Sequence, residues 1–169
     1  MTAKIILIGP PGSGKSSVGR QLNKITGLDF VDTDSLIEER EGSSISDIFL
    51  EQGEPYFRKI EEEIVGQTLD SSKGIVSLGG GSILSGAIQD KLAGVKNSVI
   101  YLEVSISNAA PRVGFNKERP LLVGNPRAKW QSLMEARRPI YEALSGHKIS
   151  TDNKKPNQVA EEIKKAVGL

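Results

Sequence analysis

Short apolar runs alternate along the chain with longer stretches in which apolar residues recur at helical spacing. The short runs predict strands of a parallel sheet at residues 4–9, 28–33, 74–80 and 98–104, with a fifth at 147–151. The longer stretches predict helices at residues 15–26, 43–69, 127–144 and 157–167, with a turn at Gly53 to Pro55. Strands that alternate with helices predict a three-layer α/β/α sandwich, a five-stranded parallel sheet with helices on both faces.

Length and composition exclude several kinds of site. The 169 residues, 37% hydrophobic and 25% charged, are typical of one globular domain, which we expect to span 1–169. The absence of cysteine excludes disulfides and thiolate chemistry, and the single histidine, His147, excludes a site of several histidines and is expected to be structural. No apolar run is long enough for a membrane span, and a strand-like run follows Met1 almost at once. We therefore expect a cytoplasmic location and no membrane partner, and we also expect a monomer.

Charge is nearly balanced over the whole chain but uneven along it. A net charge of +1 gives no overall electrostatic attraction to nucleic acid or to a membrane surface. Residues 29–70 carry thirteen acids against three bases, whereas residues 112–138 carry seven bases against two acids. The basic segment indicates a local anionic ligand. Nucleic acid is an alternative ligand, but basic and aromatic residues do not alternate there as nucleic-acid binding would favour.

Residues 9–16, GPPGSGKS, match the phosphate-loop pattern G-x-x-x-x-G-K-[ST] and lie between a predicted strand and a predicted helix. In such a loop, backbone N–H groups and the helix N-terminus attract phosphate oxygens. Lys15 would reach the terminal phosphates and the Ser16 hydroxyl would ligate Mg²⁺. The alternative without function is a Gly-Pro turn followed by a surface lysine. The motif indicates that a nucleotide is bound, but not whether its phosphate is hydrolysed or transferred.

Two further segments argue against a nucleotide switch or a motor. Residues 116–119, NKER, end in arginine where a guanine-binding segment needs an acid, and residues 74–82 end in glycines where a motor ATPase carries an acid. The acids, Asp32 and Asp34, lie instead at the end of another predicted strand, that at residues 28–33. One of them could hold a metal through water while the other accepts a hydroxyl proton. The alternative is structural, with Asp34 or Thr33 as the N-cap of a helix over 35–41.

Glycines and arginines could supply the rest of a two-substrate site. Gly79 to Gly81 permit close approach of the backbone to a ligand, although they could also form a plain turn. Arg58, Arg119 and Arg137 would each, taken alone, be a surface charge. Beside a phosphate loop they provide the positive charge that a moving phosphoryl group needs and a fork for an anionic acceptor. Arg119 lies between Gly114 and Gly124, in a segment that could close over the phosphates.

These separated elements together resemble the shikimate kinase family. The likeness runs from residue 5 to about 159 and rests on GPPGSGKSS, DTD, IFLEQGEPYFRKIE, LGGGS, RPLL and RRPIY. It implies a fold of P-loop kinase type, an acceptor-binding helical region at about 33–61 and a mobile lid at about 113–124. It also implies an enzyme of aromatic amino acid biosynthesis that moves the γ-phosphoryl group of ATP to the 3-hydroxyl of shikimate with Mg²⁺, giving shikimate 3-phosphate and ADP.

The resemblance also implies a role for each matching residue. ATP would be bound by Gly12, Ser13, Gly14, Lys15, Ser16, Ser17, Arg112, Arg119, Lys155 and Pro156. Shikimate would be bound by Asp34, Arg58, Glu61, Gly80, Gly81 and Arg137, with Phe49, Phe57, Pro120 and Leu121 beside its ring. Mg²⁺ would be held by Ser16 and, through water, by Asp32. The residues that act on the reacting atoms would be Lys15, Asp34 and Arg119. Arg138 would be an alternative or an addition to Arg137 in binding the shikimate carboxylate.

Two other functions stay open at this point. A kinase of another small polyol acid, such as gluconate, would share the phosphate loop and the architecture, although the acceptor residues Asp34, Arg58 and Arg137 argue against it. A catalytically silent nucleotide-binding module would be expected to lack the lysine, the base or the covering arginine, and the sequence has all three. We therefore expect ATP and shikimate as the small-molecule partners and no nucleic acid.

Overall fold

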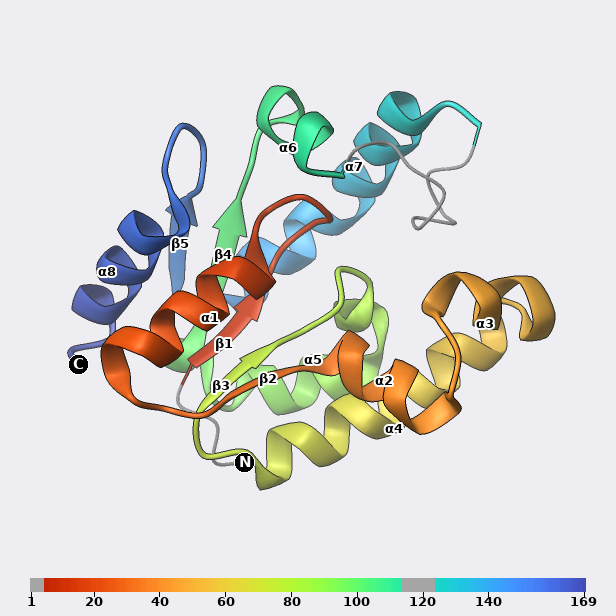
Figure 1. Cartoon of the computed structure of the whole chain (residues 1–169), viewed down its shortest axis with the longest axis horizontal. Coiled ribbons are helices and arrows are strands. Elements are labelled where there is room, and N and C mark those ends of the chain that lie inside the picture. Colours follow the sequence, from red (N-terminus) through yellow and green to blue (C-terminus); the bar gives the residue numbers. More distant parts are fainter. Residues whose placement is uncertain (1–4, 114–123) are drawn as a thin grey trace.

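Five parallel strands form the centre of the structure, a computed structural model that describes residues 5–113 and 124–169 (Figure 1). The strands are β1 (Ile5–Ile8), β2 (Phe30–Asp32), β3 (Ile75–Ser77), β4 (Val99–Glu103) and β5 (His147–Ser150). They lie in the order β2-β3-β1-β4-β5, and every neighbouring pair is parallel. The five predicted strands are confirmed, and the carboxyl ends of β1, β2 and β3 meet at one edge of the sheet.

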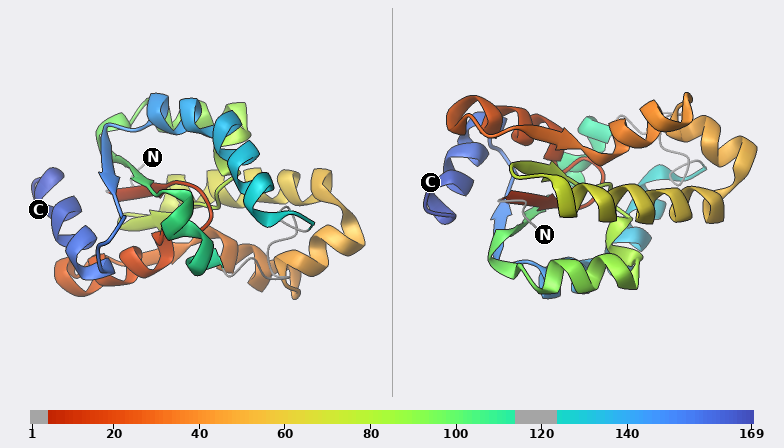
Figure 2. Two further views of the ribbon diagram at one scale, coloured as in Figure 1. Left: turned by 90° about the horizontal axis from the view of Figure 1, so that it is seen from above. Right: turned by 90° about the horizontal axis from the view of Figure 1, so that it is seen from below.

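Helices cover both faces of the sheet, which confirms the predicted sandwich (Figure 2). Side chains alternate along the strands, so Ile5 and Leu7 of β1 pack toward α1 (Lys15–Thr26) and α8 (Pro156–Ala166). Ile6 and Ile8 pack on the opposite face with residues of α4 (Glu54–Ser71), α5 (Gly86–Ala93) and α7 (Pro126–Leu144). The continuous apolar run of β1 therefore serves two core clusters.

The helical stretch predicted at 43–69, with its turn at Gly53 to Pro55, forms two helices, and a separate helix precedes them. α2 (Thr33–Glu41) ends at Gly42, whose φ of 67° is the left-handed conformation that glycine adopts without strain. α3 (Ile45–Gln52) and α4 meet at Gly53, which confirms the predicted turn. These three helices share a third apolar cluster: Ile37, Ile48, Phe57, Ile60 and Ile64. α2, α3 and the start of α4 form the extension at the right of Figure 1, and α4 runs from there back along the bottom of the molecule.

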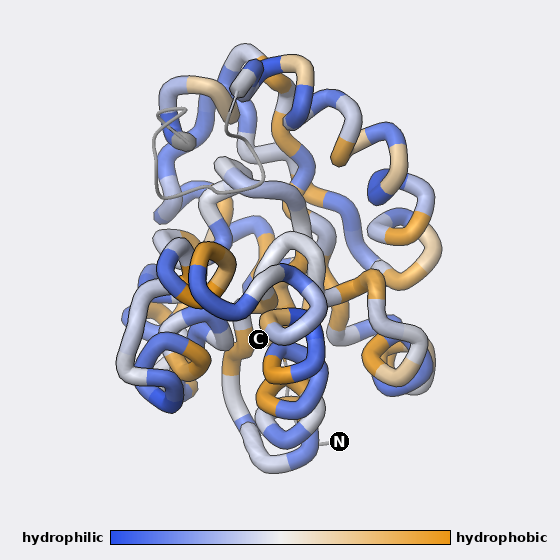
Figure 3. The backbone as a smooth tube through the Cα atoms, turned by 90° about the vertical axis from the view of Figure 1, so that its right-hand side faces the viewer, coloured by the Kyte–Doolittle hydropathy of each residue, from blue (hydrophilic) through white to orange (hydrophobic). Residues whose placement is uncertain are grey.

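Two helices were not predicted. α5 packs on α4 and α7, and α6 (Ile106–Val113) follows β4. Short 3-10 helices, η1 (Ser82–Leu84) and η2 (Lys96–Ser98), complete the connections. Hydrophilic and hydrophobic stretches alternate along the helices in Figure 3, as expected where one side of each helix packs on the sheet. Within the described ranges, none of the helices has the length and apolar character that crossing a bilayer demands.

Candidate active site

The phosphate loop connects β1 to α1 and folds around the ammonium group of its own lysine. Lys15 Nζ donates hydrogen bonds to the carbonyl oxygens of Gly9 (2.7 Å) and Pro10 (3.1 Å) and lies 3.4 Å from Ser13 Oγ. A Cβ on Gly9 would lie 2.6 Å from the carbonyl oxygen of Leu102, so this position has no room for a side chain. The predicted phosphate loop is therefore present between β1 and α1. Its lysine bonds carbonyl oxygens of the loop itself, and the first turn of α1 follows the loop directly.

Two side chains from distant elements hold the outer part of this loop. Trp130 Nε1 of α7 donates to the carbonyl oxygen of Pro11 at 2.9 Å, and Arg112 of α6 donates to the carbonyl oxygen of Gly12 at 3.2 Å. Arg112 also donates to the hydroxyl and the carbonyl oxygen of Thr151, both at 2.9 Å. Arg112 was predicted beside ATP and lies against the loop, whereas the contact of Trp130 was not predicted. No sequence pattern marks a tryptophan that bonds a backbone 119 residues away.

Asp32 ends β2 and joins the phosphate loop to α2. Its Oδ1 accepts from the N–H of Asp34 at 3.0 Å, and its Oδ2 accepts a short hydrogen bond from Ser16 Oγ. The N-cap of this helix is therefore Asp32, whereas the structural alternative assigned it to Asp34 or Thr33. Thr33 is buried, and its hydroxyl donates to the carbonyl oxygen of Ser77. With Asp32 as the cap, the Asp34 side chain faces the cleft.

A cleft of about 280 Å³ opens at the carboxyl ends of β1, β2 and β3, where parallel sheets bind ligands. It is lined by Pro11, Gly12, Gly14, Lys15, Ser16, Ser17, Asp32, Asp34, Ser77, Leu78, Gly79, Gly80 and Arg112. The phosphate loop, both predicted aspartates and the first two residues of the second glycine loop (residues 79–81) thus share one cavity. Asp34 lies close to this second loop, because a Cβ on Gly79 would be 2.6 Å from Asp34 Oδ1.

Arg58 lies against the second glycine loop and is held by a buried acid. A Cβ on Gly81 would be 2.6 Å from Arg58 Nη2. Arg58 Nη1 pairs with Glu61 Oε1 at 2.8 Å, and the side chains of Arg58 and Glu61 are 22% and 4% exposed. Ser82 Oγ donates to the other oxygen of Glu61 at 3.0 Å. Arg58 is therefore not a solvated surface charge, since its main partner is buried.

The apolar residues predicted beside the acceptor ring lie next to Arg58. The Phe57 ring is buried, and Arg58 Cζ lies 5.3 Å from the centroid of this ring, a cation–π arrangement. The half-buried Phe49 contacts Phe57 with ring centroids 4.8 Å apart. Both rings belong to the apolar cluster of α2, α3 and α4. The helical region predicted to bind the acceptor therefore has its own core, with an arginine at its edge.

The adjacent arginines of α7 differ in burial. Arg137 is 4% exposed, and a Cβ on Gly80 would lie 3.6 Å from its Nη1, whereas Arg138 is exposed. The hydroxyl of Tyr141, one helical turn further on, donates to the carbonyl oxygen of Gly80 at 2.5 Å. Burial raises the pKa of the Tyr141 phenol, and the positive charge of Arg137 opposes that rise. Arg137, rather than Arg138, therefore faces the second glycine loop.

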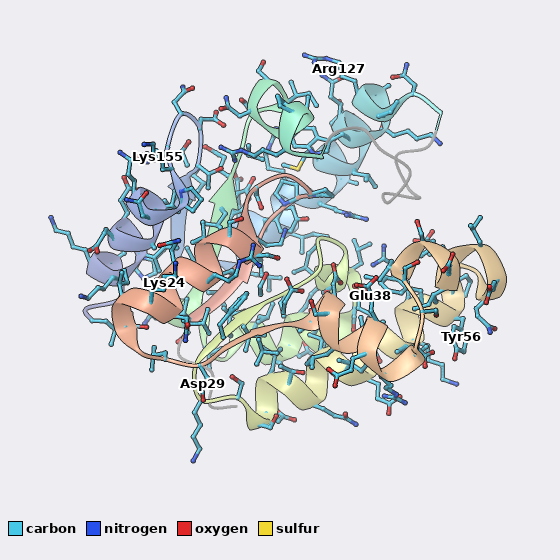
Figure 4. All side chains as sticks on the ribbon, in the orientation of Figure 1. Lys24, Asp29, Glu38, Tyr56, Arg127 and Lys155 are labelled. Carbon is cyan, nitrogen blue, oxygen red and sulfur yellow. The ribbon has the colours of Figure 1, made fainter. Side chains whose placement is uncertain are left out.

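Some predicted residues lie away from this cavity or outside the described ranges. Lys155 is exposed just before α8, where its N–H donates to Gln158 Oε1, and Pro156 is the first residue of that helix (Figure 4). Neither lines the cleft. The predicted lid at 113–124 has residues 114–123 outside the described ranges, and with them Arg119, Pro120 and Leu121. His147 lies on β5, in register with Ile100.

The oxygen atoms of Ser16 and Asp32 fit a magnesium ion. A hydroxyl and a carboxylate lie together beside the phosphate loop, and hard oxygen ligands are those that Mg²⁺ prefers. Within residues 5–113 and 124–169, no group of three or more His, Cys, Asp or Glu side chains is placed to hold a metal alone. Phosphate oxygens would therefore have to supply several of the ligands, as in phosphoryl-transfer enzymes.

Comparison with known proteins identifies relatives over nearly the whole chain. The family model for shikimate kinase matches residues 11–168. The shikimate kinase of Rhodococcus jostii is 46% identical, with 96% of each chain covered, and that of Thermobifida fusca is 48% identical, covering 95% of this chain and 92% of its own. The structure of a shikimate kinase from Acinetobacter baumannii in complex with shikimate superposes with a TM-score of 0.91 at 31% identity, covering 99% of this chain and 93% of that one.

Proposed function

The chain belongs to the shikimate kinase family, and we propose that ATP and shikimate meet between the phosphate loop and the second glycine loop. Its activity is the transfer of the γ-phosphoryl group of ATP to the 3-hydroxyl of shikimate, giving shikimate 3-phosphate and ADP. The observation that supports this location is the shared cavity. Lys15, Asp34 and Gly80 all line it, and Arg58 and Arg137 lie against the second glycine loop.

On the donor side, the phosphate loop binds the triphosphate. In this proposal Lys15 exchanges the carbonyl oxygens of Gly9 and Pro10 for phosphate oxygens, which are stronger partners for an ammonium group because they carry charge. Ser16 would ligate Mg²⁺, and Asp32 would support the ion through water. When bound with ATP, Mg²⁺ neutralises charge on the phosphate oxygens. The short hydrogen bond from Ser16 to Asp32 keeps both groups beside the loop.

On the acceptor side, shikimate presents a carboxylate and three hydroxyls. Arg58 and Arg137 bind the carboxylate, because both guanidinium groups lie against the second glycine loop and planar guanidinium matches carboxylate geometry. Glu61 keeps Arg58 in place, since the acid is buried and bonds both Arg58 and Ser82. Asp34 accepts hydrogen bonds from the hydroxyls, and Phe49 and Phe57 border the apolar side of the ring.

The reaction then needs positioning and charge more than covalent chemistry. The acceptor oxygen bonds to the γ-phosphorus as the bond between that phosphorus and the β–γ bridging oxygen breaks, and the hydroxyl proton goes to Asp34. Lys15 stabilises negative charge on the moving group, and Arg119 is proposed to do so from the lid. Aligned reactants and preorganised positive charge provide most of the acceleration in such sites.

ADP release measured with ATP and Mg²⁺, with and without shikimate, tests this function. We expect shikimate-dependent turnover and a phosphate monoester of shikimate in the ³¹P NMR spectrum. Gluconate, the competing small polyol acid, is expected to give no more than the background without an acceptor. Turnover with gluconate but not with shikimate would assign the site to the alternative kinase. ADP release that neither acid accelerates would overturn the acceptor site.

A further inference from the structure

The second glycine loop is a β-turn whose central peptide can take two orientations. The N–H of Ser82 donates to the carbonyl oxygen of Gly79 at 3.0 Å, which makes Gly80 and Gly81 the two central residues. Gly81 has φ −97° and ψ 1°, the values of a type I turn. A type II turn would rotate the peptide between Gly80 and Gly81 by about half a turn and needs positive φ at Gly81. Because glycine can adopt the backbone angles of both forms, the sequence of the turn does not determine which form it takes.

Tyr141 contacts the atom that distinguishes the two forms. Its hydroxyl donates to the carbonyl oxygen of Gly80 at 2.5 Å, and this carbonyl belongs to the central peptide of the turn. Rotation of that peptide would carry the oxygen away from the hydroxyl and break the bond. Burial raises the pKa of Tyr141, so the phenol stays protonated and remains a donor throughout the neutral range. Tyr141 therefore favours the type I form.

The orientation of this peptide also sets where the N–H of Gly81 points. A trans peptide is planar, and its C=O and N–H point in opposite directions. With the Gly80 carbonyl directed at Tyr141, the Gly81 N–H is directed away from it. Gly81 is buried, and its N–H donates to no acceptor within the part of the chain that the structure describes. A buried N–H without a partner is uncommon and indicates a place for a ligand oxygen.

We propose that Tyr141 is a positioning residue for the acceptor: it fixes the turn so that the N–H of Gly81, beside Arg58, donates to an oxygen of shikimate. The proposal rests on the proposed function for the identity of that oxygen. Tyr141 itself touches the loop and not the substrate. Arg137 lies four residues earlier on the same helical face, so one helix places an acceptor ligand and its support together.

A neighbouring tyrosine offers a matched control. Tyr101 of β4 is also buried and stacks on Tyr141, with ring centroids 5.2 Å apart. Its hydroxyl has no hydrogen-bond partner among the residues that the structure describes. Tyr141→Phe and Tyr101→Phe thus each remove one buried hydroxyl from the same ring pair and keep both rings. Only the first removes a hydrogen bond to the turn.

Steady-state kinetics of the two variants test the proposal. We expect Tyr141→Phe to raise the shikimate KM about tenfold, the loss that corresponds to about 1.4 kcal/mol, and to leave the ATP KM within twofold of wild type. A general loss of folding would instead lower the active fraction without separating the two KM values. Tyr101→Phe should leave both KM values within twofold. A Tyr141→Phe enzyme with an unchanged shikimate KM would overturn the proposal.

Backbone ¹H–¹⁵N NMR tests the turn without relying on turnover. The Gly81 amide signal should shift in Tyr141→Phe, should stay in place in Tyr101→Phe, and should shift when shikimate is added to the wild-type protein. The last measurement needs no variant, so it stands even if Tyr141→Phe does not fold. A wild-type Gly81 signal that saturating shikimate leaves unmoved would overturn the proposal. Failure of wild-type turnover alone would instead count against the proposed function, and the comparison of the two variants would still test the turn.

Discussion

The donor and acceptor sides of the cleft are built from different parts of the chain. On the donor side, the carbonyl oxygens of four consecutive residues, 9–12, accept hydrogen bonds from Lys15, Trp130 and Arg112. On the acceptor side, charged side chains are paired with one another, as Arg58 with Glu61, and packed against a glycine turn. The donor side therefore depends on the shape of one short backbone segment, and the acceptor side on side chains from several elements.

This difference has consequences for substitution. A backbone carbonyl cannot be removed by mutation, so the hydrogen bonds that hold the shape of the phosphate loop can be altered only through the side chains that donate them, those of Lys15, Trp130 and Arg112. The charged acceptor residues, in contrast, are separate side chains, and the loss of Arg58 would leave its buried partner Glu61 without compensation. We therefore expect donor-side variants to change ATP parameters and acceptor-side variants to change shikimate parameters, with little exchange between the two.

Lys15 should give the largest effect, because it is the donor-side residue that we propose to contact the moving phosphoryl group. We expect Lys15→Met to lower kcat by about a thousandfold, as for the loss of one preorganised charge at a transition state. Lys24→Met, in the last turn of the same helix and exposed, is the control and should match wild type (Figure 4). ADP release measures both, and near-normal turnover in Lys15→Met would remove the lysine from the mechanism.

Asp34 should give the next largest effect and should separate chemistry from nucleotide binding. We expect Asp34→Asn to lower kcat about a hundredfold, as for the loss of a general base, while the affinity for ATP measured by calorimetry changes little. Asp29→Asn is the control, because Asp29 is exposed and directly precedes β2, the strand that Asp34 follows (Figure 4). An Asp34→Asn enzyme whose affinity for ATP falls as much as its kcat would place Asp34 on the donor side.

The two sides also differ in how far the sequence predicts them. The phosphate loop is contiguous, so the single motif GPPGSGKS predicts the residues of the loop, the helix that follows it and the phosphate group that it binds. The acceptor residues are spread from Asp34 to Arg137, and only the resemblance to a known family connected them. Burial then decided what spacing left open, since Arg137 faces the glycine turn and its exposed neighbour Arg138 does not.

The parts that the sequence did not predict depend on long-range contacts. Strand positions followed from the apolar runs, but the order β2-β3-β1-β4-β5 is a property of the assembled sheet. Trp130 and Tyr141 bond carbonyl oxygens 119 and 61 residues away, and a side chain that binds a backbone atom leaves no residue pattern at its partner. The N-cap of α2 was assigned to Thr33 or Asp34 because each can cap a helix, whereas the cap also accepts from Ser16, which favours Asp32.

Glu61 tests the acceptor side without touching the reacting atoms. We expect Glu61→Gln to raise the shikimate KM about tenfold, because the neutral amide no longer holds the Arg58 guanidinium by charge, and to leave the ATP KM unchanged. Glu62→Gln is the matched control, since Glu62 is exposed and bonds Ser85 instead. A Glu61→Gln enzyme with equal rises in both KM values would contradict the separation of the two sides.

Trp130 should give the smallest effect, and it should change the ATP KM rather than the shikimate KM that Glu61→Gln changes. Trp130→Phe keeps an aromatic ring in the core but removes the N–H that binds the Pro11 carbonyl oxygen, a hydrogen bond worth about 1 kcal/mol. We expect the ATP KM to rise about threefold to fivefold and the shikimate KM to stay unchanged. Met134→Leu, one turn further along α7 and also buried, alters the packing of that helix without altering this bond, and should match wild type.

Combining Trp130→Phe with Glu61→Gln sharpens the comparison further. If the donor and acceptor sides act independently, the changes in activation free energy caused by the two variants should add to within about 0.5 kcal/mol. The quantity to measure is kcat/KM for each substrate at saturating concentration of the other. A coupling well above that margin would mean that the cleft transmits strain from the phosphate loop to Arg58, and α7 would be the route to examine. That helix carries both Trp130, which bonds the phosphate loop, and Tyr141, which bonds the glycine turn.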